Sequence, residues 1–193
     1  MTTDERQRSF IAIELSDETK ALLGALRDEL SACRCRASWL RPDNYHLTFC
    51  FLGDISVEQQ AAIAEHMEPA SAAVAPFTLS VRGLGAFPSS RKPQVVWVGA
   101  HVEGQALQTL HAAATEAALA ADLQPDMKPF RPHITLGRVR EQRGVGPIRK
   151  LLQAHSAFDA GQTHVDRVSL FASKLASEGA VHTKLLDFPL ACP

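Results

Sequence analysis

The chain has 193 residues, of which 46% are hydrophobic and 21% are charged, as is typical of a globular protein and not of a disordered one. Its 20 basic and 21 acidic residues give a net charge of −1, which argues against a protein that coats long nucleic acids but leaves room for a short or terminal substrate. No apolar run is long enough to cross a bilayer, and residues 1–8 lack an apolar signal core. We therefore expect a cytoplasmic protein without a membrane partner.

Periodic apolar residues predict the elements of the first half of the chain. Residues 9–15 alternate and predict a strand, and Ser16 is expected to cap a helix over residues 17–32. We expect that helix to bury Leu22, Leu26 and Leu30. A second strand is predicted over residues 45–52, ending at the turn formed by Gly53 and Asp54, and Ser56 with Gln59 forms a capping box for a helix through Met67.

The second half continues with strands at residues 77–84 and 95–101, separated by a turn-rich loop over residues 87–93. The alanine-rich residues 104–123 predict a helix because Leu107, Leu110, Ala114 and Ala118 keep helical spacing. A strand at 134–139, a short helix opening at Pro147, and strands at 165–171 and 181–188 complete the series. The order of strands and helices lacks the regular alternation of a doubly wound sheet, so we predict the α+β class.

Four cysteines, Cys33, Cys35, Cys50 and Cys192, bear on metal binding. They include no Cys-x-x-Cys pair, and Cys33 and Cys35 have no second cluster of matching ligands. We expect four reduced thiols and neither a zinc site nor another cofactor.

One tetrapeptide pattern occurs twice. His-Leu-Thr-Phe at residues 46–49 returns as His-Ile-Thr-Leu at residues 133–136, so both copies combine histidine, an apolar residue, threonine and a second apolar residue. In a strand, alternate side chains share a face, so His and Thr of each copy are expected on one side and the two apolar residues in the core. A single copy would indicate an ordinary half-exposed pair. Two copies instead predict two polar strand faces across a common cleft.

Two histidines and two threonines in one cleft suit the cleavage of a phosphodiester. One imidazole can take a proton from water while the other gives a proton to the departing oxygen. The hydroxyls of Thr48 and Thr135 can hold the non-bridging oxygens. Neither motif carries the carboxylate that usually accompanies metal-bound histidines, so a metal-free site is predicted. The other six histidines share no pattern and are interpreted as surface or structural residues: His66, His101, His111, His155, His164 and His182.

The sequence around both motifs resembles the two-histidine phosphoesterases, and within them the bacterial and archaeal RNA 2′,3′-cyclic phosphodiesterases, also called the 2′-5′ RNA ligase family. The resemblance rests on residues 39–49 (Trp-Leu-Arg-Pro-Asp-Asn-Tyr-His-Leu-Thr-Phe) and 129–136 (Pro-Phe-Arg-Pro-His-Ile-Thr-Leu), and it extends over nearly the whole chain. It implies one domain over residues 1–193, built from two duplicated, pseudo-symmetric lobes. Each lobe would have an antiparallel sheet with outer helices, and the two would enclose a central cleft.

The resemblance also implies the chemical roles. His46 would be the proton donor to the leaving oxygen, and His133 would be the base that activates water. The substrate would be an RNA end with a 2′,3′-cyclic phosphate, opened to a 2′-phosphate, and some family members also join ends through 2′-5′ linkages. Arg131, whose guanidinium suits oxyanions, is a further candidate for phosphate binding, although a structural role fits it nearly as well. We expect a monomer without an obligate protein partner.

The chain departs from the family pattern at two positions. Cys50, expected on the face of His46 and Thr48, stands where the family often has Lys, and Ala172 stands where the last strands often have a Tyr that can stack on a base. These departures leave the substrate open. A two-histidine phosphodiesterase for small cyclic nucleotides or 2′-5′ oligoadenylate, a non-catalytic nucleotide-binding module and a metallohydrolase are the alternatives.

Overall fold

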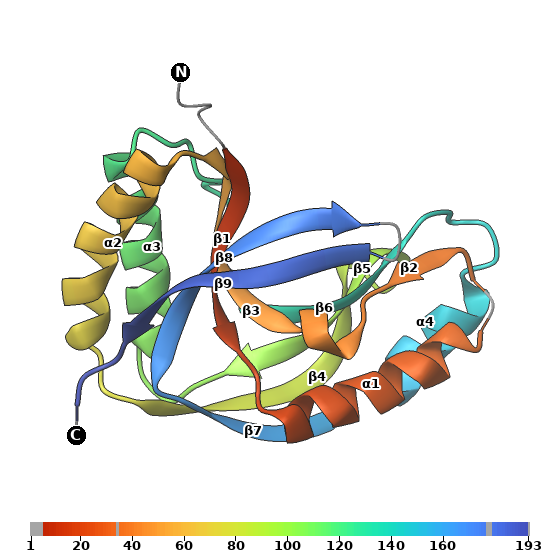
Figure 1. The fold of residues 1–193 in the computed structure, drawn as a ribbon. Helices are drawn as coiled ribbons and strands as arrows, with labels where there is room; N and C mark the ends of the chain where they lie inside the picture. The colour runs from red at the N-terminus through yellow and green to blue at the C-terminus, as the bar shows by residue number, and fades with distance from the viewer. Residues whose placement is uncertain (1–5, 34, 177–178, 193) are drawn as a thin grey trace.

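The described residues, 6–33, 35–176 and 179–192, form nine strands in one curved antiparallel sheet in the computed structural model (Figure 1). The strands lie in the order β7 (Asp159–Val165), β4 (Phe77–Ser89), β5 (Lys92–His101), β6 (His133–Val139), β3 (His46–Ile55), β1 (Gln7–Glu14), β8 (Arg167–Ala176) and β9 (Gly179–Pro189), with β2 (Ala37–Trp39) beside β6. β3 and β6, which carry the two motifs, therefore lie next to each other at the middle of the sheet.

A single paired position, Leu47 opposite Ile134, joins β3 to β6. These are the apolar residues that follow the two motif histidines, and both are fully buried. The histidine and the threonine that flank each of these apolar residues face the other side of the sheet, because side chains alternate along a strand. Because β3 and β6 are antiparallel, the two motifs lie side by side at the centre of the sheet and run in opposite directions.

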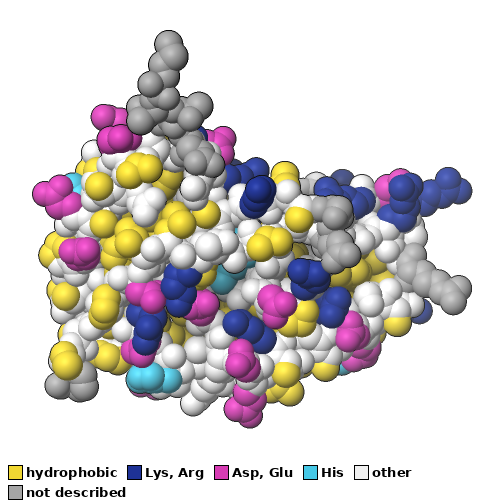
Figure 2. Space-filling model, viewed as in Figure 1, with side chains coloured by type: hydrophobic (Ala, Val, Ile, Leu, Met, Phe, Trp, Pro, Cys, Tyr) yellow, Lys and Arg dark blue, Asp and Glu magenta, His cyan; other side chains and the backbone are white. Residues whose placement is uncertain are grey.

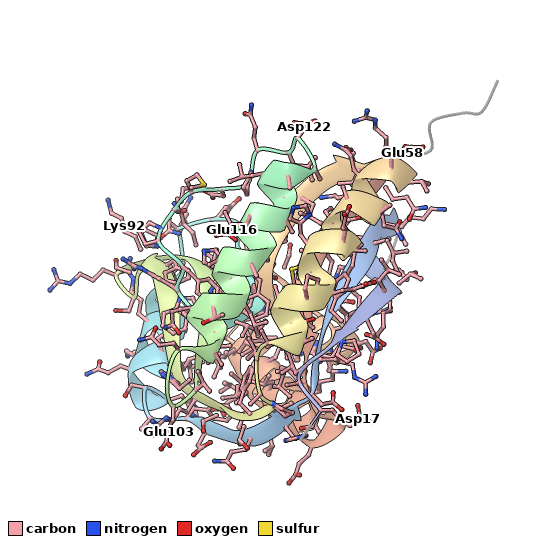
Figure 3. All side chains as sticks on the ribbon, turned by 90° about the vertical axis from the view of Figure 1, so that its left-hand side faces the viewer. Asp17, Glu58, Lys92, Glu103, Glu116 and Asp122 are labelled. Carbon is pink, nitrogen blue, oxygen red and sulfur yellow. The ribbon has the colours of Figure 1, made fainter. Side chains whose placement is uncertain are left out.

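The helices cover the outer surface of the two halves of the sheet. α2 (Val57–Ala72) and α3 (Ala106–Ala120) pack on each other, α2 also against β9 and α3 also against β3 (Figure 1). Their charged side chains, such as Glu58 and Glu116, lie on the outside (Figure 3). α1 (Asp17–Ser31) packs against β7, β6 and β2, α4 (Gly146–Ala154) packs against β4, and the short helix η1 (Pro42–Asn44) precedes β3. The predicted α+β class is confirmed. In the described part of the chain, no helix is long and apolar enough to cross a membrane.

Both predicted helix caps are present. The Ser16 hydroxyl accepts a hydrogen bond from the Thr19 amide, and Ser56 with Gln59 forms the full capping box. The predicted inner face of α1 was wrong in one residue: Leu22 is 42% exposed, and Leu23 is buried in its place. The buried stripe of α1 runs through Thr19, Leu23, Leu26 and Leu30, and Leu22 lies at its edge.

Several strand boundaries differ from the prediction. β3 does not end at Gly53 and Asp54 but continues to Ile55, because pairing with β1 extends over that segment. The predicted loop at 87–93 is mostly strand, with a tight turn between Ser89 and Lys92. β2 and β7 were not predicted, and the strand expected from residue 165 begins at Arg167, because Val165 ends β7. β7 is mostly polar, so its sequence carries little of the apolar periodicity that predicts a strand.

Each motif ends in a β-bulge. On β3, Thr48 lies opposite Ala12 but Cys50 lies opposite Ile11, which leaves Phe49 as the extra residue. The strand β6 has the equivalent shift, with Thr135 opposite Trp97 and Gly137 opposite Val96. Beyond a bulge the alternation of faces reverses. The prediction that Cys50 shares a face with His46 was therefore wrong: Cys50 is buried in the core, 5% exposed.

Candidate active site

The polar residues of both motifs line one cleft of about 610 Å³. His46 and Thr48 come from β3, and His133 and Thr135 come from β6. Figure 2 shows histidine surface in a recess near the middle of the molecule, with Lys and Arg side chains around it. The structure thus brings together the four residues that the sequence singled out.

His46 lies on an aromatic support. Its ring stacks on Phe10 with centroids 4.6 Å apart, and the ring of His182 meets it edge-on at 5.3 Å. Burial, and after it the charge of His182, lowers the pKa of His46 from 6.5 to about 4, while a hydrogen bond to the Asn44 backbone opposes the shift. His46 is therefore neutral at pH 7.

His133 is held by a different set of contacts. Its Nδ1 donates to the carbonyl oxygen of Arg131 at 2.7 Å, and its ring meets Phe87 edge-on at 5.0 Å. Because a carbonyl can only accept, the neutral ring carries its proton on Nδ1 and keeps the lone pair on Nε2. Burial lowers the pKa of His133, the Arg131 carbonyl raises it, and the charge of Arg138 lowers it further.

Three basic side chains line the cleft with the motif residues: Arg8, Lys128 and Arg138. Arg138 follows the bulge of β6, which turns it toward His133. Lys128 pairs with Asp126, which also lines the cleft, at 2.8 Å. The two arginines and the hydroxyls of Thr48 and Thr135 make the cleft suited to an anion such as a phosphate.

The side chain of Arg131 lies elsewhere. It lines a neighbouring hollow of about 460 Å³ that shares Phe87 and His133 with the cleft, and its guanidinium carbon lies 5.9 Å from the centre of the Phe87 ring. Arg131 acts on the site through its carbonyl oxygen, which orients His133.

Among the cleft residues that were not predicted are Phe51, Arg138 and His182. Phe51 and Arg138 each lie five positions after a motif histidine, so comparison of the two copies beyond the tetrapeptide would have paired them. His182, interpreted from the sequence as a surface or structural residue, comes from β9. Nothing in the sequence indicates that β9 lies near β3, because β1 and β8 separate them in the sheet.

Within residues 6–33, 35–176 and 179–192, no group of three His, Cys, Asp or Glu side chains is arranged to hold a metal ion. All four cysteines are free, with Cys50 buried and Cys192 exposed.

A cleft between two strands that each carry a His-x-Thr motif indicates a phosphoesterase. Comparison with known proteins leads to the same class. The chain belongs to the LigT-like phosphoesterase family, whose model matches residues 13–97 and 99–182. Each match contains one of the two motifs.

Relatives with established names cover most of the chain. The RNA 2′,3′-cyclic phosphodiesterase of Aquifex aeolicus is 26% identical over 95% of this chain and 97% of its own length. The RNA 2′,3′-cyclic phosphodiesterase of Geobacillus stearothermophilus is 31% identical over 86% of this chain. The matched region covers 54% of the length of that relative. Among solved structures, E. coli LigT complexed with 3′-AMP is 27% identical, with a TM-score of 0.79 over 96% of this chain and 99% of that one.

Proposed function

We propose that this chain is an RNA 2′,3′-cyclic phosphodiesterase that opens cyclic phosphate ends to 2′-phosphates without a metal ion. The observation that carries the proposal is the cleft that contains His46, Thr48, His133 and Thr135 together. The names of the relatives and the complex of E. coli LigT with a nucleotide support it.

In the proposed reaction, Nε2 of His133 takes a proton from a water molecule as its oxygen attacks the phosphorus. The bond from phosphorus to the 3′-oxygen breaks, and protonated His46 gives its proton to that oxygen. One water is consumed, and the phosphate remains on the 2′-oxygen. The hydrogen bond from His133 to the Arg131 carbonyl supports the role of base, because it leaves Nε2 unprotonated.

The role of His46 as acid places a condition on the substrate. A ring whose pKa is about 4 is unprotonated at neutral pH, which by itself does not favour the role of an acid. The assignment therefore requires that the bound phosphate, with its negative charge, raises the pKa of His46. Once protonated, such a weakly basic ring is a strong proton donor.

The phosphate would be held by Thr48, Thr135 and Arg138. The hydroxyls and the guanidinium donate to the non-bridging oxygens, where negative charge increases in the transition state. Arg131 would contribute through its carbonyl. In ligation, the 5′-hydroxyl of a second RNA would attack the cyclic phosphate in place of water, the bond to the 3′-oxygen would break, and a 2′-5′ linkage would form.

The proposal extends to the organisation of the protein. We regard residues 1–193 as one domain of two duplicated lobes, which is supported by the two family matches and by the equivalent bulges of β3 and β6. Because one chain supplies all the proposed site residues, a monomer without a protein partner is sufficient. The cytoplasm, where RNA ends are produced, is the proposed location.

The direct test is incubation of the protein with an oligonucleotide that ends in a 2′,3′-cyclic phosphate, in excess EDTA. We expect an oligonucleotide with a 2′-phosphate as the product. Complete loss of activity in EDTA, restored by zinc or manganese, would refute the metal-independent mechanism. The same assay with small cyclic nucleotides and 2′-5′ oligoadenylate separates the alternatives in substrate.

A further inference from the structure

The neighbouring hollow of about 460 Å³ adjoins the proposed base. His133 and Phe87 line both this hollow and the cleft, whereas His46, the proposed acid, lines the cleft and not the hollow. In a displacement at phosphorus, the attacking and the leaving oxygen lie roughly in line on opposite sides. The hollow therefore lies on the side of His133, where the attacking oxygen enters in the proposed reaction.

The lining of the hollow is larger and more apolar than a water molecule requires. It includes the buried Ala100 and Leu107 and the rings of Trp97 and Phe130. The ring of Phe130 stacks on His111 with centroids 4.2 Å apart, which fixes its plane. Pockets for small organic ligands occupy roughly 300–1,000 Å³ and are lined mainly by apolar and aromatic side chains. The hollow has this character, and a nucleoside offers the flat base that such a lining binds.

The polar part of the hollow carries a positive charge. The exposed side chain of Arg131 lines it together with the exposed His101 and Gln108. The Arg131 guanidinium lies over the ring of Phe87, and within the described part of the chain no carboxylate pairs with it. None of the described residues that line the hollow is acidic. The guanidinium is therefore available to an anion, and in RNA a phosphate follows each nucleoside.

We propose that the neighbouring hollow binds the first nucleotide of a second RNA, whose 5′-hydroxyl attacks the cyclic phosphate in place of water; this rests on the proposed function. The base lies against the apolar lining, and the phosphate that follows the nucleoside binds the guanidinium of Arg131. His133 takes the proton of the 5′-hydroxyl as its oxygen bonds to phosphorus. The bond from phosphorus to the 3′-oxygen breaks, and His46 gives its proton to that oxygen. The product is a 2′-5′ diester, and no water is consumed.

The test measures the ratio of transfer to hydrolysis at initial rates, with uridine 2′,3′-cyclic phosphate as the donor. Two acceptors are compared: the dinucleotide adenylyl-(3′→5′)-adenosine, which can fill the hollow, and methanol, which is too small to do so. Transfer and hydrolysis both need His46 and His133, so a defect in either histidine lowers both rates together. In wild type, transfer to the dinucleotide should saturate with its concentration, whereas transfer to methanol should rise in proportion.

Two variants change the charge of the hollow. Arg131→Gln removes the cation and keeps the backbone carbonyl that orients His133. It should lower the ratio for the dinucleotide on the order of 10-fold, the effect of one charge-assisted hydrogen bond, and leave the ratio for methanol unchanged. Gln108→Glu adds a negative charge and should act in the same direction. Arg149→Gln and Gln153→Glu make the same two changes on the exposed surface of α4 and should alter neither ratio.

A wild type that hydrolyses the donor but forms no product with the dinucleotide would overturn the proposal. An equal fall of both ratios in Arg131→Gln would assign Arg131 to the orientation of His133 alone, and unchanged ratios in both variants would place the acceptor elsewhere; either result overturns the proposal. If wild type neither hydrolyses nor transfers, the proposed function fails, and calorimetric titration with the dinucleotide decides the binding separately. Weaker binding by Arg131→Gln and Gln108→Glu would support the hollow as its site. Equal binding by all variants, or none by wild type, would overturn it.

Discussion

The two walls of the cleft carry the same His-x-Thr motif, but the residues behind the two histidines differ. On the β3 wall, His46 stacks face-to-face on Phe10 and touches His182. On the β6 wall, His133 meets Phe87 edge-on and donates to the Arg131 carbonyl at 2.7 Å. Catalysis requires one ring protonated and the other neutral, and two identical side chains can differ in this way only if their surroundings differ. In the proposed mechanism the motif would supply the chemistry, and the different packing behind the two rings would make them unequal.

The largest expected effect is the loss of either histidine. His46→Ala and His133→Ala should each lower kcat on a cyclic phosphate end by about 10²–10⁴-fold, the usual contribution of one positioned acid or base. The double variant should lose far less than the product of the two losses, because the pair acts as a unit. His66→Ala, on the exposed surface of α2, is the matched control and should keep full activity. Steady-state rates of the four variants measure the effect.

Removal of the threonine hydroxyls should have the next largest effect. Thr48→Val and Thr135→Val keep the shape of the side chain and remove a donor to the developing oxyanion, so kcat should fall by about 10²-fold. Thr78→Val removes a hydroxyl from an exposed position of β4 and is the control. Unchanged kcat with a higher KM would show that the hydroxyls bind the ground state and the transition state equally.

The pH dependence should reveal the burial of both rings. Falling pH protonates the base and rising pH removes the proton of the acid, so kcat/KM should be bell-shaped. Because burial lowers the pKa of His46 to about 4 and also lowers that of His133, both limbs should lie on the acid side of the ordinary value of 6.5. The profile of kcat should lie at higher pH, since the bound phosphate raises both pKa values.

His182→Phe sharpens the same measurement. Phenylalanine keeps the ring volume and hence the burial of His46, but removes the neighbouring charge that lowers its pKa. The other charges that act on His46, from His133 on β6 and Lys20 on α1, remain. The kcat/KM profile should move toward neutral pH by a fraction of a unit, whereas His164→Phe, on the distant strand β7, should not move it. An unmoved profile in His182→Phe would show that the two walls differ for another reason.

Much of the site could be predicted from the sequence because its central residues belong to a four-residue pattern that occurs twice. Two copies of one four-residue pattern, read with strand alternation, indicated His46, Thr48, His133 and Thr135, which the structure brings into one cleft. The helix caps at Ser16 and Ser56 were also predictable, since capping depends on neighbouring residues alone.

The remaining features depend on pairing between distant strands. Strict alternation placed Cys50 in the cleft, but a bulge, which is visible only in the register of β3 against β1, buries it and exposes Phe51 instead. His182 reaches the cleft because β9 follows β8 and β1 across the sheet. Its Nδ1 is a buried atom that lacks a hydrogen-bond partner among the described residues, and no local pattern predicts this.

The division of roles between the two walls is tested most directly with a substrate whose leaving group needs no proton. On a nucleoside p-nitrophenyl phosphodiester, protonation of the departing oxygen contributes little, whereas activation of water is still required. His46→Ala should therefore recover much of the wild-type rate on this substrate, and His133→Ala should remain slow. Recovery by His133→Ala instead would reverse the acid and the base, and full activity of both variants on every substrate would show that the two motifs are structural.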